Sequence, residues 1–140
     1  MDPEAPTAAE LEAQPVVQAA FAAAWADSFP GDPILGHEEG GYIYVNPTSD
    51  DVIVRRVPPG SRRLLDLSSP PDIMGHYLVA TFHTHPNLIA DGGDPEPSNA
   101  DRREAVASGV PWFVVSELGV YVVGPDCRIG GLTGSPGYPI

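Results

Sequence analysis

Apolar residues recur at helical spacing near the start of the chain. Thr7 to Glu10 has the form of a helix-capping box, and the apolar positions after it favour a helix whose best-defined part runs from Pro15 to Ser28. Because proline disrupts a helix interior, the helix either begins near Pro15 or is kinked there. Residues 1–7 are acidic and rich in proline, so we expect them to form a tail.

The middle of the chain carries the patterns of strands. An aromatic and β-branched run over 37–45, which passes through two glycines, predicts a strand, and 51–57 predicts its hairpin partner. Residues 58–75 hold many prolines and glycines and a short apolar stretch, Leu64 to Leu67, and predict a long loop with at most one helical turn. The apolar run over 76–82 then predicts another strand.

A loop, a helix and a second hairpin are expected next. Residues 86–97 are rich in glycine, proline and aspartate, which is typical of a loop. Ser98 is a favourable helix N-cap, and the helix it begins should end at Ser108, before Gly109. Residues 112–116 and 120–123 predict two strands joined by a tight turn.

This order of elements predicts the fold class. It favours a single α/β domain of the mixed α+β kind over residues 1–140, with helices packed on a mixed β-sheet. The chain is long enough to bury a substantial core. Residues 125–140 are rich in glycine and proline and are expected to form an irregular tail.

Charge and cysteine content narrow the classes of function. The chain has 19 acidic and 7 basic residues and a net charge of −12, which argues against nucleic acid or an anionic membrane as partner. No apolar run approaches the ~20 residues of a membrane span, and the acidic start is unlike a signal peptide. A single cysteine, Cys127, excludes an intramolecular disulfide and a multi-cysteine zinc site, and we expect an incidental or buried thiol there. A cytoplasmic protein is expected.

Two histidines and an aspartate predict a metal centre. His83 and His85 are separated by one residue at the end of an apolar run, so on an extended backbone both imidazoles point the same way. Asp101 opens the predicted helix and can supply an oxygen ligand. Three protein ligands with a free position are typical of a catalytic zinc site, so we expect one Zn²⁺ per chain. Asp91 and Asp94 are weaker alternatives to Asp101.

The same residues carry a resemblance to a known family. His83-x-His85-Pro86 followed by Ser98-x-x-Asp101 resembles the signature of the JAB/JAMM (MPN-domain) zinc metalloproteases. That signature is preceded by a glutamate at the start of an earlier strand, with a small residue three positions later, and Glu38 is in register with it. The resemblance spans about residues 35–124 and implies a JAB/MPN-like fold of a minimal, prokaryotic type.

One departure from the family pattern is visible. The interval from His85 to Ser98 is a few residues longer than in the compact form of the signature. The additional residues lie in the acidic loop 87–97, which we expect to influence the shape of the substrate groove.

The resemblance also implies roles for the other residues. Glu38 would be the general base and Ser98 the donor to the oxyanion, with Glu39 as an alternative base. Read without the family, Ser98 and an aspartate three residues later simply cap a helix. The other two histidines, His37 and His76, are expected to be structural.

The expected function is a zinc-dependent metallopeptidase or isopeptidase. The resemblance implies hydrolysis of an amide or isopeptide bond in a protein substrate, most simply a bacterial ubiquitin-like modifier or its conjugate. A toxin or phage-associated peptidase is the alternative within the family. A non-catalytic MPN scaffold is disfavoured because the ligands are present, and a zinc deaminase is excluded because a single cysteine cannot supply its P-C-x-x-C signature. The sequence leaves the oligomeric state open.

Overall fold

The computed structural model describes residues 6–126, 128 and 129. Cys127 and most of the predicted C-terminal tail therefore lie outside the described residues. The helices are α1 (Ala8–Glu12), α2 (Pro15–Asp27) and α3 (Asn99–Ser108), with a 3₁₀ turn at Ile89–Asp91. The strands are β1 (Gly40–Val45), β2 (Val52–Arg56), β3 (Tyr77–Thr84), β4 (Trp112–Ser116) and β5 (Gly119–Val123).

All five strands form one mixed sheet in the order β2-β1-β3-β4-β5. The pair β3–β4 is parallel, and the chain crosses from one strand to the other through α3. The other three pairs are antiparallel. The described chain is thus a single α+β domain with a five-stranded mixed sheet and three helices, as the order of elements predicted.

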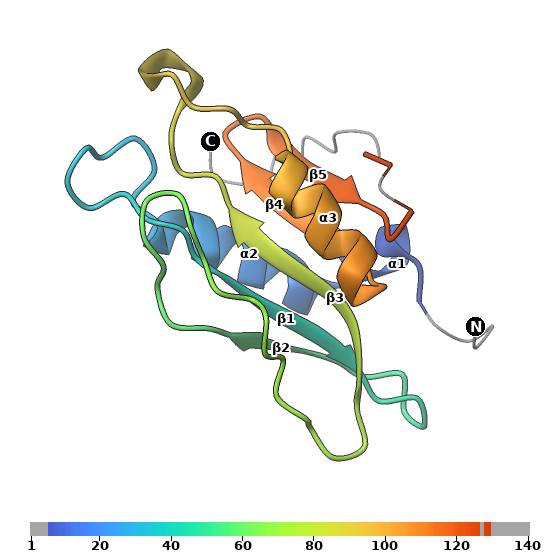
Figure 1. Cartoon of the computed structure of the whole chain (residues 1–140). Coiled ribbons are helices and arrows are strands. Elements are labelled where there is room, and N and C mark those ends of the chain that lie inside the picture. Colours follow the sequence, from blue (N-terminus) through green and yellow to red (C-terminus); the bar gives the residue numbers. More distant parts are fainter. Residues whose placement is uncertain (1–5, 127, 130–140) are drawn as a thin grey trace.

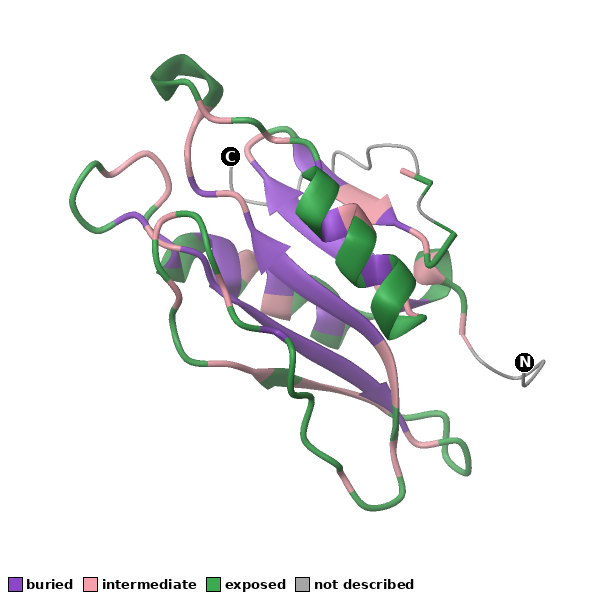
Figure 2. Ribbon diagram, in the orientation of Figure 1, coloured by how far each residue is buried: buried purple, intermediate pink, exposed green. Residues whose placement is uncertain are grey.

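Helices cover both faces of this sheet. In Figure 1, α2 lies behind the sheet and α3 lies in front of it. The back face holds the larger apolar cluster, in which Phe21 of α2 packs against Phe82 of β3 and Phe113 of β4. The front face holds a second cluster that includes Tyr42, Trp112 and Ala105 of α3. The central strands are consequently buried on both faces (Figure 2).

The sequence located most of these elements. The break at Pro15 separates two helices, so the first of the two options for this proline is correct. Gly109 ends α3 in the left-handed conformation (φ 73°) that favours glycine. None of the described helices has the length and apolar character that a membrane span requires.

Two strand boundaries differ from expectation by more than one residue. β1 begins only at Gly40, because the backbone of Glu38 pairs with Gly60 and Ser61 of the long loop instead of with a strand. The loop 58–75 contains no helical turn. β3 continues two residues beyond the predicted Phe82, which places His83 inside the ladder opposite Gly40.

Gly40 is required by the close approach of these two strands. A Cβ at this position would lie 2.2 Å from the Phe82 carbonyl oxygen and 2.9 Å from the His83 Cα. We expect Gly40→Ala to lower the free energy of unfolding by about 3 kcal/mol, because backbone must shift to admit the methyl group. Urea unfolding measures this loss.

The matched control is Gly109→Ala. Unlike Gly40, this glycine has a positive φ, and no atom lies within 4 Å of an added Cβ, so only local backbone strain is expected, about 1 kcal/mol. Equal losses in the two variants would contradict the steric explanation for Gly40.

Candidate metal centre

The two predicted histidine ligands lie at the carboxyl end of β3. Strand alternation turns Ala80 and Phe82 toward the α2 face, and it turns His83 and His85 toward the other face. The Nε2 atoms of the two imidazoles are 3.2 Å apart. The spacing of one residue therefore does bring both rings to one point.

Asp101 reaches the same point from the first turn of α3. Its Oδ1 lies 3.1 Å from His83 Nε2, and its Oδ2 lies 3.3 Å from His85 Nε2. Each of the three residues offers one ligand atom, and these atoms lie within 4.8 Å of one another, close enough to hold a metal ion. Among the described residues, neither Asp91 nor Asp94 belongs to the group.

The surroundings of the two imidazoles suit a metal ligand set. His85 Nδ1 is 3.0 Å from the Asp94 carbonyl oxygen, so this nitrogen donates its hydrogen and Nε2 keeps its lone pair. The ring of His83 is buried and meets Trp112 edge-on at 5.8 Å. Two imidazoles and one carboxylate are donors that zinc binds with a position left open.

Asp101 and His83 perturb each other strongly. Burial by itself would raise the pKa of Asp101, but hydrogen bonds with His83 and His85 and the charge on His83 together hold it far below its usual range. Burial would lower the pKa of His83, yet the hydrogen bond and charge of Asp101, with a contribution from Glu38, raise it. Without a metal, protonated His83 thus partners ionised Asp101.

Protons should therefore compete with zinc at this centre. A metal ligand must be a neutral imidazole, and His83 holds its proton to a higher pH than the ordinary ~6.5 of histidine. We expect zinc affinity to fall as the pH is lowered from about 8 to about 6, with release of about one proton or more on binding. Competition with a chromophoric chelator across this range measures the slope.

His76→Gln is the control for this titration. His76 lies just before the opposite end of β3 and hydrogen-bonds to the Met74 carbonyl, so its loss should leave the slope unchanged. A wild-type zinc affinity that does not vary with pH would contradict competition at His83.

The two candidate bases, Glu38 and Glu39, point to opposite faces of the sheet. Glu38 lines the cavity that also contains the metal group, together with His83 and Asp101. Burial raises the pKa of Glu38; nearby His83 and His85 oppose this increase and Asp101 adds to it. Glu39 instead points to the α2 face, where it pairs with Arg56 and His37. Only Glu38 is near the metal group.

Ser98 holds the start of α3 and also lines the cavity. Its Oγ accepts a hydrogen bond from the Asp101 amide (3.1 Å), and its own amide donates to Asp101 Oδ2 (2.8 Å). This is the capping box that the sequence predicted, so the structural reading of the pair is correct. Because Oγ acts as acceptor in the cap, its hydroxyl hydrogen is not used there. A capping role and a role toward a ligand in the cavity are compatible.

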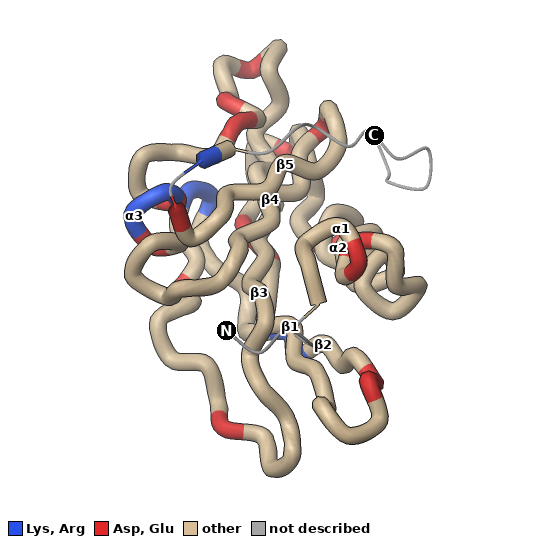
Figure 3. Tube along the Cα trace, turned by 90° about the vertical axis from the view of Figure 1, so that its right-hand side faces the viewer, with Lys and Arg blue, Asp and Glu red and all other residues tan. Residues whose placement is uncertain are grey.

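A cavity of about 1030 Å³ surrounds these residues. Parts of three loops wall it, namely 29–37, 58–75 and 86–97. Loops 29–37 and 86–97 lie at the end of the molecule where β3 terminates, whereas loop 58–75 passes this end and continues to the opposite end, where β3 begins (Figure 1). Arg62 links them, because its guanidinium donates to the Asp32 carbonyl (3.4 Å) and to Asn87 Oδ1 (3.3 Å). Acidic residues are spread over several loops, and α3 carries both acidic residues and the arginines Arg102 and Arg103 (Figure 3). The cavity is large enough for several residues of an extended peptide.

The remaining histidines behave as structural residues. His37 Nδ1 lies 2.8 Å from the Leu35 carbonyl and its Nε2 lies 2.5 Å from Glu39. Two features of the centre were not predicted from the sequence, namely the ring of Trp112 beside His83 and the Asp94 carbonyl that orients His85. A tryptophan that opens a strand after the helix was a visible signal for the first, but a backbone carbonyl leaves no sequence signal.

Comparison of the chain with models of protein families, with curated proteins and with solved structures found no match.

Proposed function

We propose that this protein is a zinc-dependent metallopeptidase of the JAB/JAMM type, with a JAB/MPN-like fold, that hydrolyses an amide or isopeptide bond. The observation that carries the proposal is the convergence of His83, His85 and Asp101 in a cavity that also contains the buried carboxyl of Glu38. A structural zinc site is usually closed by four protein ligands, whereas the described residues contribute three to this group. The arrangement thus suits catalysis better than stabilisation.

In this reaction the three ligands would hold the zinc ion, and Glu38 acts as the general base. A zinc ion held by the three ligands would supply a Lewis acid that makes a water molecule acidic near neutral pH. Glu38 accepts the proton that the water loses as its oxygen attacks the carbonyl carbon, and returns it to the leaving nitrogen as the C–N bond breaks. The raised pKa of Glu38 suits the first step, because it makes this carboxylate a stronger proton acceptor than an ordinary glutamate.

Ser98 donates a hydrogen bond to the oxyanion of the tetrahedral intermediate. Its hydroxyl lines the cavity at the start of α3, and the hydrogen that the cap leaves unused can be donated to the developing negative charge. Donors of this kind contribute about 3 kcal/mol to transition-state stabilisation. The N-terminus of α3 adds a partial positive charge at the same point.

The proposed substrate is a protein. A cavity of about 1030 Å³ between three loops suits an extended chain segment better than a small metabolite. The resemblance adds a ubiquitin-like modifier, joined to a lysine or extended at its C-terminus, as our first choice. A toxin or phage-associated peptidase with another protein substrate remains the alternative within the same chemistry.

The test combines metal analysis with a cleavage assay. The purified protein should contain about one zinc per chain, and the zinc-loaded form should cleave bacterial ubiquitin-like proteins that carry a short C-terminal extension. Mass spectrometry identifies the scissile bond. Removal of zinc by a chelator should abolish cleavage, and added zinc should restore it.

Two outcomes would overturn the proposal. The first is a protein that contains no zinc after purification and takes up none when zinc is added. The second is a zinc-loaded protein that cleaves neither these substrates nor a library of unrelated peptides. Cleavage of unrelated peptides alone would favour the alternative peptidase.

A further inference from the structure

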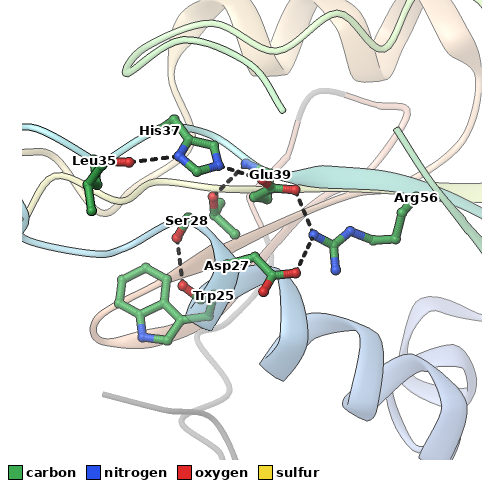
Figure 4. A network of polar contacts seen from close by, with 8 residues as sticks. Trp25, Asp27, Ser28, Leu35, His37, Glu39 and Arg56 are labelled. Atoms are coloured by element: carbon green, nitrogen blue, oxygen red, sulfur yellow. Dashed lines mark hydrogen bonds and ion pairs between the residues drawn. The ribbon is translucent and has the colours of Figure 1, made fainter. Parts of the chain in front are cut away.

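Glu39 is a buried carboxylate that the proposed reaction does not use. It is 5 % exposed and lies on the sheet face opposite to the metal centre. Arg56 of β2 donates to its Oε1 at 2.6 Å and also reaches Asp27 at the end of α2 at 3.2 Å. On the other side, His37 pairs with its Oε2 (Figure 4). Since a buried charge is costly unless it is paired, these contacts fix the side chain in one orientation.

The backbone of Glu39 is joined to the strand that carries the ligands. Its amide donates to Thr84 Oγ1 at 3.0 Å, and its carbonyl accepts from the Thr84 amide at 2.9 Å. Thr84 is fully buried and is the residue between His83 and His85. This pair of hydrogen bonds extends the β1–β3 ladder by one step beyond Gly40, on the side of the metal centre.

Glu38 is fixed as a consequence. Its own amide donates to the Ser61 carbonyl (2.8 Å) and its carbonyl accepts from the Gly60 amide (2.9 Å). In an extended chain, neighbouring side chains point to opposite faces, so with Glu39 held on the α2 face Glu38 must face the cavity. Glu38 cannot turn away unless the contacts of Glu39 break.

We propose that Glu39 and Thr84 are positioning residues that hold Glu38 against the metal centre, with Arg56 and His37 fixing Glu39 from the opposite face. This inference rests on the proposed function, because it assigns Glu39 a purpose through the general base. The two hydrogen bonds between Glu39 and Thr84, here called the positioning joint, set the distance between the segment that carries Glu38 and the strand that carries His83. A displacement of about 1 Å in such a site can reduce the rate about 100-fold, so a small loosening of this joint should be measurable.

The experiment uses variants of Thr84. Thr84→Val keeps the shape and the β-branched side chain but removes the acceptor of the Glu39 amide, whereas Thr84→Ser keeps the hydroxyl. Glu39→Gln is a second variant, which weakens the pairing with Arg56 without changing the volume. Ser28→Ala is the control, because it removes a buried hydrogen bond to the Trp25 carbonyl in the same region without touching Glu39.

Four quantities are measured on each full-length variant. One is the titration of the Glu38 carboxyl by ¹³C NMR in the metal-free protein, which needs neither zinc nor activity. The others are zinc affinity and the kcat and KM of cleavage. In Thr84→Val we expect the pKa of Glu38 to fall toward its ordinary value as the carboxyl becomes more exposed, and kcat to fall about 10- to 100-fold. Zinc affinity and KM should stay within about threefold of wild type.

The variants Thr84→Ser and Ser28→Ala distinguish a positioning role of Thr84 from a general loss of stability. Thr84→Ser should restore the Glu38 titration and kcat, Glu39→Gln should give a smaller change in the same direction, and Ser28→Ala should change neither quantity. A wild-type titration in Thr84→Val, or an equal change in Ser28→Ala, would overturn the proposal. If wild type cleaves nothing but the titrations behave as expected, the proposed function fails and the positioning joint stands.

Discussion

Glu38→Gln is expected to retain about one zinc per chain and to lose about 10³-fold in kcat/KM for the cleaved bond. Glutamine has the size of glutamate but cannot accept and return a proton, so the proton transfers lose their carrier. Metal content should persist because Glu38 lies outside the group formed by His83, His85 and Asp101. Metal analysis and steady-state kinetics on the same preparation check both halves of the prediction.

Glu38→Gln should also increase the stability of the metal-free protein, although it lowers activity. Burial raises the pKa of Glu38, so the ionised carboxyl is less favourable in the folded than in the unfolded chain. That cost is fully present above the folded pKa and absent below the unfolded value of about 4.3. The metal-free Glu38→Gln protein should therefore be more stable than wild type at neutral pH, and this advantage should disappear in acid.

Glu12→Gln is the matched control. The same chemical change is made at the end of α1, away from the cavity, and should leave kcat/KM unchanged. Full activity in Glu38→Gln would show that another group carries the proton. Loss of zinc in Glu38→Gln would instead make Glu38 a ligand.

The sequence contained enough information to find the metal group because its spacings are local. One intervening residue on a strand places His83 and His85 on one face, and the capping box places Asp101 in the first turn of a helix. The sequence also contains a pattern that distinguishes Glu38 from Glu39. The alternation that runs back from Tyr42 through Gly40 puts Glu38, and not Glu39, on the face that bears the ligands.

The walls of the cavity could not be predicted in this way. Loop 58–75 has no periodicity, and its position depends on contacts with segments far away in the chain. Arg62 bonds to the carbonyl of Asp32 and to the side chain of Asn87, and neither partner follows from spacing or composition. The short Leu64 to Leu67 stretch suggested a helical turn, but Leu67 instead packs into the apolar cluster with Tyr42 and Trp112. Tertiary burial decided the backbone there.

The parallel pairing of β3 and β4 is the other feature that only the structure reveals. It places the carboxyl end of β3 next to the start of α3, and in mixed α/β sheets this is where ligand sites are commonly built. The sequence predicted both elements but not their relation. Without that pairing Asp101 and the histidines would be separate motifs, so the sheet order is what converts them into one group.

Asp101→Asn separates the two roles of this residue and should reduce zinc affinity more than about 100-fold. The loss of a group that only supports a ligand already costs 10- to 100-fold, and here a charged ligand is removed. The amide oxygen of asparagine can still accept from the Ser98 amide, so α3 should keep its capped start. Chelator competition measures the affinity, and circular dichroism monitors the helix.

Without metal, the difference in stability between wild type and Asp101→Asn should depend on pH. The lowered pKa of Asp101 contributes stability above the unfolded value of about 3.9, and this is lost as the pH falls through the folded pKa. The raised pKa of His83 contributes stability below the unfolded value of about 6.5, and this is lost as the pH rises through the folded pKa. Metal-free Asp101→Asn should thus be least stable, relative to wild type, between about pH 4 and pH 6.5.

Zinc should add a second difference above that window. At a free zinc concentration 100 times its dissociation constant, wild type should gain about 2.7 kcal/mol, whereas Asp101→Asn should gain almost nothing at the same concentration. Asp91→Asn, an exposed loop acid outside the metal group, should respond to zinc as wild type does. If Asp91→Asn loses the zinc response and Asp101→Asn keeps it, the third ligand comes from the loop and α3 only caps itself.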